Sequence, residues 1–208
     1  MEQILSKLAG VVVLAAVLSS CDGTPKSSET VENETMKKET YTEREAIETI
    51  LSRKSVRQYE DRAVEAEKVE LLLRAAMAAP SGMDRRPWSF VVVTERETLN
   101  RLAEGLPYAK MLTHAPLAIV VCGDPQSPYW TLDCSAATQN ILLAAEALGL
   151  GAVWTATYPT PELMQAANEA LGLPEGIQSL AVIPMGYPAG ETAPKDKFDA
   201  TRIHYNKW

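Results

Sequence analysis

Residues 129–148, YWTLDCSAATQNILLAAEAL, form the most informative segment of this chain. Apolar or small side chains recur at helical spacing around most of its circumference, which predicts one long helix. A helix that is apolar nearly all round is buried on every side, so we expect it at the centre of the core or at an interface between subunits. Gly149 follows directly and supplies the C′ residue that ends such a helix.

The sequence on either side of this segment carries further helical and strand-like patterns. Capping signals open two of the helices, a capping box at Thr42 and Glu45 and a proline at Pro161 after Thr160. Helices and strands mix without a strict βαβ order, so the predicted fold class is α+β rather than a doubly wound sheet. The expected helices are residues 42–51, 66–79, 96–103, 108–113 and 161–172, and the expected strands are residues 89–93, 117–122, 152–156 and 178–185.

The composition of the 208 residues suits one folded domain with a tail. Apolar residues make up 46% of the chain and charged residues 23%, which is enough apolar material for a packed core. The net charge is −7. A nucleic-acid-binding protein usually presents a basic face, so the acidic total argues against that class and still permits a small basic pocket.

The first 21 residues resemble a bacterial lipoprotein signal. Lys7 gives a thin positive start, residues 8–18 are apolar or small, and Leu18-Ser19-Ser20-Cys21 closes the run. The run is shorter than the roughly 20 apolar residues of a transmembrane span and fits a signal-peptide core. We therefore expect Cys21 to be acylated and to hold the protein on a membrane of the bacterial cell envelope, on its periplasmic or surface side. An ordinary signal peptide or a short N-terminal anchor stays open.

Residues 22–40 are rich in Ser, Thr, Glu, Lys and Asn and nearly free of apolar side chains. Such a segment cannot bury enough surface to order itself, so we expect a disordered tether. The folded domain is therefore expected at residues 41–208.

Cysteine and histidine are scarce in the expected domain. Cys122 ends a strand-like run and Cys134 lies early in the long helix, so both are expected to be small buried residues. In an oxidising compartment they could pair, but the sequence leaves their geometry open. His114 and His204 lie at no metal-ligand spacing from each other or from a cysteine, which argues against a zinc site.

The first stretch with binding chemistry is Arg53-Lys54-Ser55-Val56-Arg57-Gln58-Tyr59, directly after a helix. Its three cations and its hydroxyl group suit a phosphate, which guanidinium groups bind with two hydrogen bonds. A solvated basic patch at a helix C-terminus, favoured by the helix dipole, explains the same residues.

Three more stretches are candidates. Pro80-Ser81-Gly82-Met83-Asp84-Arg85-Arg86-Pro87-Trp88-Ser89-Phe90 contains an irregular loop that enters a strand and presents backbone groups to a ligand. A plain connector with Trp88 packed in the core is the alternative. In Gly151-Ala152-Val153-Trp154-Thr155-Ala156, small residues let a flat ligand approach the backbone. Lys195-Asp196-Lys197 places two cations on the tail. Strand packing and surface solvation are the alternatives for these last two.

Taken in order, these stretches resemble the FMN-binding nitroreductase family. The resemblance rests on Arg-x-Ser-x-Arg after a helix, a Pro-Ser-x-x-(Asn/Asp)-x-x-Pro-Trp loop, the long alanine-rich helix, Leu-Gly-Leu-Gly-x-x-Trp, and a late Gly-Tyr-Pro with Lys-x-Lys. It covers residues 43–208. It implies a nitroreductase-like α+β fold, in which helices surround a mostly antiparallel central sheet, and an intertwined homodimer whose C-terminal tails wrap the partner.

The resemblance also implies two FMN sites at the dimer interface. Arg53 and the tail lysines would hold the phosphate, while Ser55 and Arg57 would meet the ribityl chain and the pyrimidine edge of the ring. The loop at 80–84 would reach the flavin from the other subunit. The implied cofactor-binding residues are Arg53, Lys54, Ser55, Arg57, Pro80, Ser81, Gly82, Met83, Asp84, Lys110, Trp154, Thr155, Ala156, Lys195 and Lys197.

The implied activity is NAD(P)H-dependent, ping-pong reduction of small acceptors such as nitroaromatics or quinones. Flavin carries the hydride and electron chemistry, so no general acid or base is expected. Asp84 stands where many members have Asn, and Arg86 where many have Gln, which bears on acceptor preference more than on FMN binding. A flavin-binding redox or electron-transfer lipoprotein without turnover is the alternative, and an exported enzyme leaves its donor in the cell open.

Overall fold

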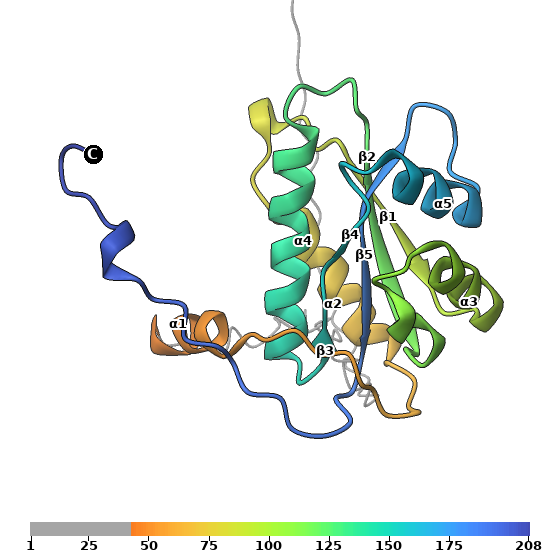
Figure 1. Cartoon of the computed structure of the whole chain (residues 1–208), viewed down its shortest axis with the longest axis horizontal. Coiled ribbons are helices and arrows are strands. Elements are labelled where there is room, and N and C mark those ends of the chain that lie inside the picture. Colours follow the sequence, from red (N-terminus) through yellow and green to blue (C-terminus); the bar gives the residue numbers. More distant parts are fainter. Residues whose placement is uncertain (1–42) are drawn as a thin grey trace, which may run out of the picture. The chain divides into compact units, whose positions relative to one another are not determined.

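The computed structural model describes residues 43–208, which belong to one compact unit. In this part of the chain, five strands form one antiparallel sheet in the order β1-β2-β5-β3, with β4 also paired to β5 (Figure 1). The strands are β1 (Trp88–Val93), β2 (Leu117–Gly123), β3 (Gly151–Ala152), β4 (Thr155–Ala156) and β5 (Gln178–Gly186). The helices are α1 (Glu43–Ser52), α2 (Ala66–Met77), α3 (Arg96–Gly105), α4 (Trp130–Ala147) and α5 (Pro161–Leu171), with short 3₁₀ turns η1 (Gly82–Asp84), η2 (Lys110–Thr113) and η3 (Ala200–Arg202).

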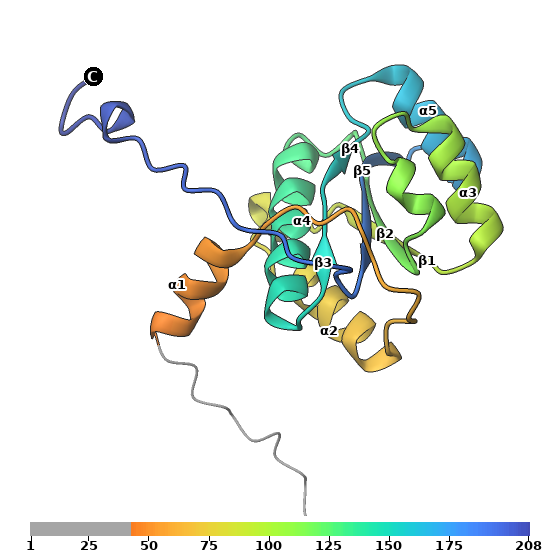
Figure 2. The same cartoon turned by 60° about the horizontal axis from the view of Figure 1, so that its bottom comes forward.

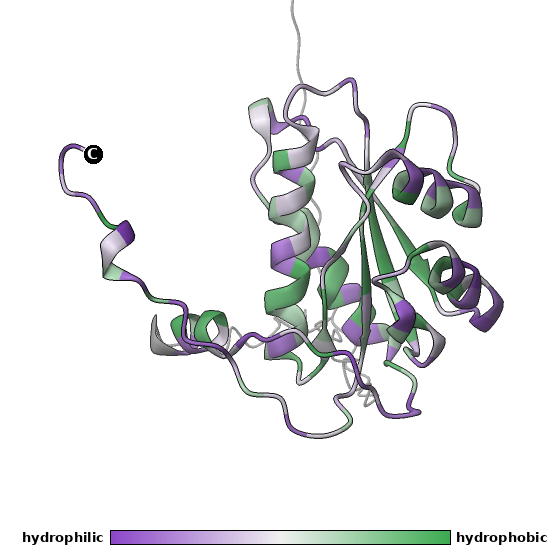
Figure 3. Ribbon diagram, viewed as in Figure 1, coloured by the Kyte–Doolittle hydropathy of each residue, from purple (hydrophilic) through white to green (hydrophobic). Residues whose placement is uncertain are grey.

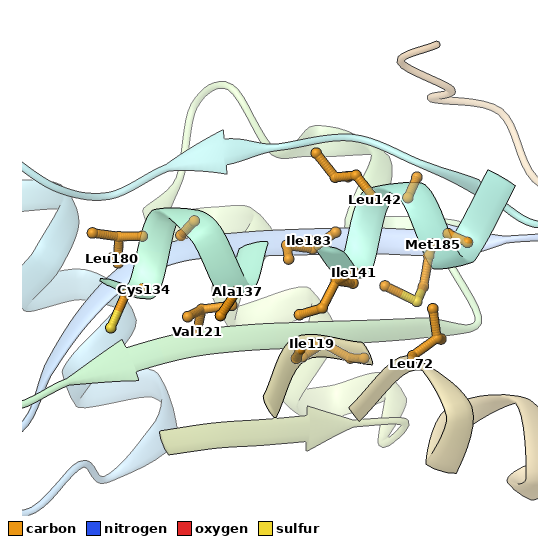
Figure 4. Packing of buried hydrophobic residues seen from close by; sticks show 14 of the residues in the cluster. Leu72, Ile119, Val121, Cys134, Ala137, Ile141, Leu142, Leu180, Ile183 and Met185 are labelled. Atoms are coloured by element: carbon orange, nitrogen blue, oxygen red, sulfur yellow. The ribbon is translucent and has the colours of Figure 1, made fainter. Parts of the chain in front are cut away.

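Helices cover both faces of the sheet, α2 and α4 on one face and α3 and α5 on the other (Figure 1). The central strand β2 shows how the sequence specifies this, because its residues alternate between two apolar clusters. Ile119 and Val121 pack with Ile141 of α4 (Figure 4). Val120, between them, belongs to the cluster under α3 and α5. Since β2 is buried on both faces, its apolar run is unbroken rather than alternating with polar residues.

The long helix α4 has one face in the core and another at the surface of this subunit. Ala137, Ile141 and Ala145 are fully buried on the sheet side. On the other side, Leu143 and Ala147 line an apolar groove of about 610 Å³ together with residues of α1 and α2. Figure 3 shows hydrophobic residues on α1 as well. The prediction that this helix lies in the core is therefore confirmed. Its place at a subunit interface stays a prediction, which the groove makes possible.

The single strand predicted at residues 152–156 is wrong, because the structure divides it into β3 and β4. Both pair with β5 in one continuous register. Between them, Val153 donates its N–H to the Pro184 carbonyl oxygen at 3.3 Å, but a proline has no N–H to donate in return. Pro184 of β5 therefore interrupts the hydrogen bonds between β5 and residues 152–156, and the predicted strand is divided there.

The other predicted helices and strands that the structure describes are confirmed, with small differences at their ends. The helix expected at 108–113 is a short 3₁₀ turn. Gly149 and Gly172, at φ +72° and +61°, take the left-handed conformation that ends α4 and α5. Thr160 occupies the N-cap position of α5, but its side chain makes no capping hydrogen bond.

Several predictions fall on residues 1–42, which lie outside the described residues. These are the Thr42 half of the capping box, the signal that ends at Cys21, and the tether at 22–40. Within the described part, no helix combines the length and the apolar character that crossing a bilayer requires.

The C-terminal tail runs away from the sheet after β5 (Figures 1 and 2). Its large side chains are open to solvent, with Phe198 exposed to 77% and Trp208 to 100%. A ring contact between His204 and Trp208, with centroids 4.1 Å apart, is local to the tail. The tail therefore presents apolar surface that a second molecule would be needed to cover.

Cys122 and Cys134 are both buried free thiols, and they belong to the apolar clusters on opposite faces of the sheet. The Sγ of Cys134 donates to the carbonyl oxygen of Cys122 at 3.5 Å rather than meeting its sulfur. The pairing that the sequence left open is not made.

We expect neither thiol to react in the native protein. Burial raises the pKa of Cys122 and of Cys134 to about 12, so at pH 8 only about one thiol in ten thousand is a thiolate. Ellman's reagent should label both residues only after unfolding in guanidinium chloride. Rapid labelling of either residue in the native protein, mapped by mass spectrometry, would contradict this placement.

Candidate functional site

The basic segment at residues 53–57 is fixed along the edge of the sheet. A parallel bridge pairs Ser55 with Ala152 of β3, and the Val56 N–H donates to the Ala152 carbonyl oxygen at 3.0 Å. Val56 is buried beside a glycine, since a Cβ on Gly151 would lie 2.6 Å from the Cβ of Val56. Because Val56 points inward, the residues on either side of it are exposed.

The C-terminal tail returns to this segment because the two stretches pair just beyond it. The Glu60 N–H donates to the Tyr187 carbonyl oxygen at 2.8 Å, and the Ala189 N–H donates to the Gln58 carbonyl oxygen at 3.0 Å. Figure 2 shows the segment after α1 and the start of the tail passing close to β3. This short ladder directs residues 192–197 back over the basic segment.

Tyr187 anchors the start of the tail. Its hydroxyl donates to Glu65 at 2.6 Å and accepts from the Lys68 ammonium at 2.9 Å, while the Arg62 guanidinium lies 3.7 Å from the ring centroid. The hydrogen bond from Tyr187, together with Arg62, lowers the pKa of Glu65 to about 2. Glu65 is therefore ionised at physiological pH, and at that pH it can accept the hydrogen bond from Tyr187 that anchors the tail.

The segment and the tail together enclose a basic pocket of about 360 Å³. Arg53 and Arg57 reach it from the segment, and Lys195 and Lys197 from the tail. Among the described residues, none of these four cations pairs with a carboxylate and no acidic side chain lines the pocket. Four such cations repel one another, so a bound anion would stabilise the arrangement. The remaining lining residues are Lys54, Ser55, Thr192 and Ala193.

Lys54 lines the same pocket, but its ammonium already has a partner. Its Nζ lies 2.7 Å from Oε1 of Glu146, near the C-terminal end of α4, and both side chains are largely shielded. The pair ties the basic segment to α4. The sequence contains no signal for it, because 92 residues separate the two side chains. Thr192 and Ala193 were likewise missed, since neither residue type indicates a ligand.

The predicted residues Trp154, Thr155 and Ala156 continue from β3 away from the pocket. Thr155 is buried and donates its hydroxyl to the Val182 carbonyl oxygen at 2.6 Å, whereas Ala156 is exposed. At about 3.3 Å per residue, Ala156 lies roughly 13 Å along this edge from Ala152, where the basic segment is attached. These three residues therefore do not line the pocket, whose lining comes from the basic segment and the tail.

The loop with five predicted site residues, Pro80, Ser81, Gly82, Met83 and Asp84, lies at the other end of α4. The Gly82 N–H donates to Oδ1 of Asp133, in the first turn of α4, at 3.0 Å. Glu146, the partner of Lys54, is about 20 Å further along the helix at 1.5 Å per residue. The structure therefore does not bring the loop and the basic segment of one chain together.

Comparison with known proteins identifies the family, because residues 50–187 match the nitroreductase family. The chain belongs to this family. A protein of Archaeoglobus fulgidus, provisionally named NADH dehydrogenase/NAD(P)H nitroreductase, is 46% identical to it over 172 residues, which cover 79% of this chain and 99% of that protein.

Two solved structures of nitroreductases share the fold. One, from Bacteroides thetaiotaomicron, has the same provisional name, is 58% identical and has a TM-score of 0.77. The match covers 78% of this chain and 98% of that one. The other, an FMN-dependent nitroreductase from Clostridium difficile R20291, is 31% identical and has a TM-score of 0.74. The match covers 78% of this chain and 99% of that one. The predicted nitroreductase-like fold is confirmed, and the protein is an oxidoreductase of this family.

The structure joins Asp84 and Arg86, the two loop residues that the family resemblance sets apart. Arg86 donates through Nε and Nη2 to the two carboxylate oxygens of Asp84, at 2.7 and 2.5 Å. The hydrogen bonds from Arg86 lower the pKa of Asp84. Asp84 is therefore an acceptor only, and Arg86 rather than Arg85 is its partner.

Lys110, the remaining predicted residue, is not brought to the pocket. Its Nζ donates to the Ala103 carbonyl oxygen at 2.7 Å, near the C-terminal end of α3. Cations stabilise helix C-termini in this way. Within one chain, Lys110 thus serves α3, and it lines a separate surface hollow with Arg96 and Thr113.

The variant Gly151→Ala tests how the basic segment is seated. The new methyl group would overlap Val56, so we expect the free energy of unfolding in urea to fall by about 1–3 kcal/mol through overpacking. Val56→Ala removes Cγ1 and Cγ2, two of the three overlapped atoms, and leaves only Cβ in the way. The double variant should therefore be less destabilised than the sum of the two single variants. Strict additivity of the two changes would show that this contact does not position the segment.

Proposed function

We propose that this protein binds FMN and uses it to pass reducing equivalents from NAD(P)H to small acceptors such as nitroaromatics or quinones. The basic pocket carries the proposal, because four cations without a carboxylate partner among the described residues suit one phosphate group. The relatives named NAD(P)H nitroreductase and FMN-dependent nitroreductase support it. When bound, FMN supplies the hydride and electron transfer, and donor and acceptor would bind in turn.

The roles we propose follow the position of each side chain. Arg53, Lys195 and Lys197 hold the phosphate, and Lys54 fixes the segment through Glu146. Ser55 and Arg57, exposed on either side of Val56, bind the ribityl chain and the pyrimidine edge of the ring. A cation at that edge stabilises negative charge on reduced flavin, which raises its reduction potential.

We also propose a homodimer, because the site is incomplete in one chain. The 80–84 loop and the basic segment lie at opposite ends of α4, so a site that uses both must take them from two chains. The exposed Leu51 of α1, at 69%, the apolar groove beside it, and Phe198 and Trp208 of the tail are the surface that a second copy would cover.

The visible absorption spectrum of the purified, desalted protein tests the cofactor. We expect flavin bands, their bleaching by NAD(P)H without oxygen, and their recovery when a nitroaromatic or a quinone is added. A colourless protein that ignores added FMN would contradict the proposal. Bound flavin that every acceptor reoxidises slowly would favour the redox or electron-transfer protein without turnover.

The variant Arg53→Gln tests the phosphate pocket. A hydrogen bond to a charged group contributes about 1.5–3 kcal/mol, so loss of this guanidinium should raise the Kd for FMN about tenfold to a hundredfold in a fluorescence titration. Arg74→Gln removes the same charge from an exposed position on α2, where Arg74 pairs with Glu70, and should leave the Kd unchanged. Equal effects of the two variants would place the phosphate elsewhere.

We further propose export and a lipid anchor at Cys21, which lies outside the described residues. The signal-like sequence that ends at this cysteine supports the proposal. In a bacterial host, Cys21→Ser should abolish incorporation of labelled palmitate and release the protein from the membrane fraction. Cys122→Ser is the matched control and should keep the label. A labelled Cys21→Ser protein would rule out this anchor.

A further inference from the structure

Asp133 is a buried carboxylate on a helix that is otherwise mostly apolar. It is 5% exposed, and it lies in the first turn of α4 between the exposed Leu132 and the fully buried Cys134. Oδ1 accepts the Gly82 N–H, and Oδ2 has no hydrogen-bond partner in the part of the chain that the structure describes. Burial of a carboxylate is costly, so a packing role alone would be met better by an apolar side chain.

The loop above Asp133 is strained. Met83, Asp84 and Arg86 have φ values of +55°, +54° and +50°, in the left-handed region that residues other than glycine seldom adopt. Such conformations persist only where the surroundings fix them. The side chains of these three residues are exposed, so the hydrophobic core contributes little to holding the loop.

The other hydrogen bonds of residues 81–86 stay within the loop. Ser81 accepts the Arg86 N–H through Oγ at 3.1 Å and the Asp84 N–H through its carbonyl oxygen at 3.1 Å. Among the hydrogen bonds of the described residues, the one from Gly82 to Asp133 alone joins this loop to another element. Gly82 also lies close to Tyr129, whose ring a Cβ on Gly82 would overlap.

We propose that Asp133 is a positioning residue that holds the 81–86 loop on the first turn of α4, in the conformation it presents to the flavin of the second subunit. This inference rests on the proposed function, and Asp133 itself touches neither flavin nor substrate. The positive end of the α4 dipole stabilises its charge, and a carboxylate accepts a stronger hydrogen bond than an amide does.

The variants Asp133→Ala and Asp133→Asn test this, with Thr138→Val as the matched control. Thr138 is fully buried on the same helix and donates its hydroxyl to the Cys134 carbonyl oxygen within α4, away from the loop. Amide hydrogen exchange at Gly82, in protein freed of flavin, reports the loop directly. We expect exchange about tenfold faster in Asp133→Ala, an intermediate rate in Asp133→Asn, and no change in Thr138→Val.

With flavin bound, Asp133→Ala should lower kcat/KM about tenfold and shift the reduction potential, while the Kd for FMN changes less than about threefold. The phosphate pocket at the other end of α4 is untouched by this change. A nearly unchanged Kd for FMN would therefore distinguish an effect on the loop from an effect on the pocket. Asp133→Asn should recover part of kcat/KM. If Asp133→Ala behaves like Thr138→Val in exchange and in kinetics, the proposal is overturned.

A second pair of variants keeps Asp133 and disturbs the loop from its own side, in case Asp133→Ala does not fold. Gly82→Ala should push the loop off the Tyr129 ring and reproduce the faster exchange and the lower kcat/KM. Tyr129→Ala in the same chain makes room and should restore both. A Gly82→Ala protein with unchanged exchange would also overturn the proposal, whereas a wild type that binds no FMN contradicts the proposed function instead.

Discussion

The candidate site depends on how Val56 is seated beside Gly151. Four cations gathered in one pocket repel one another, so contacts of the segment and the tail with the rest of the fold must hold them in place. Val56 is buried, its N–H is bonded to Ala152, and the buried Tyr59 hydroxyl lies 2.7 Å from its carbonyl oxygen and 3.0 Å from that of Pro184. Apolar burial and hydrogen bonds thus hold a segment whose side chains would otherwise move apart.

Helix α4 sets the distance between the two parts of the site. Glu146 holds the basic segment near one end through Lys54, and Asp133 holds the loop near the other. A helix of this length is stiff, so these two parts of one chain stay about 20 Å apart. The apolar groove lies along the same helix. In the proposed homodimer, the loop of one copy would have to lie near the basic segment of the other, so dimer formation would complete the site.

Much of the fold could be predicted because local sequence specifies it, as the apolar runs of β2 and α4 show. The break between β3 and β4 could not, because its cause, Pro184, lies on the neighbouring strand. The pair of Lys54 with Glu146 spans 92 residues and leaves no periodic trace. That the tail lysines meet the basic segment was implied by the family resemblance and not by spacing. Asp133 did carry a local signal, a charge within the apolar first half of a helix, but a charge alone does not name its partner.

The separation of the two ends also means that Asp84 and Arg86 of the loop lie far from the basic pocket. Asp84, ionised and bonded to Arg86, offers no N–H to a ligand. Arg86 donates two of its five side-chain N–H groups to Asp84, and the other three can bind solvent or a ligand. Where the family resemblance implies an amide donor at position 84, this chain offers guanidinium donors two residues later. Since none of the cations of the basic pocket contacts this loop, the difference would change the surface offered to an acceptor and leave the proposed phosphate site as it is.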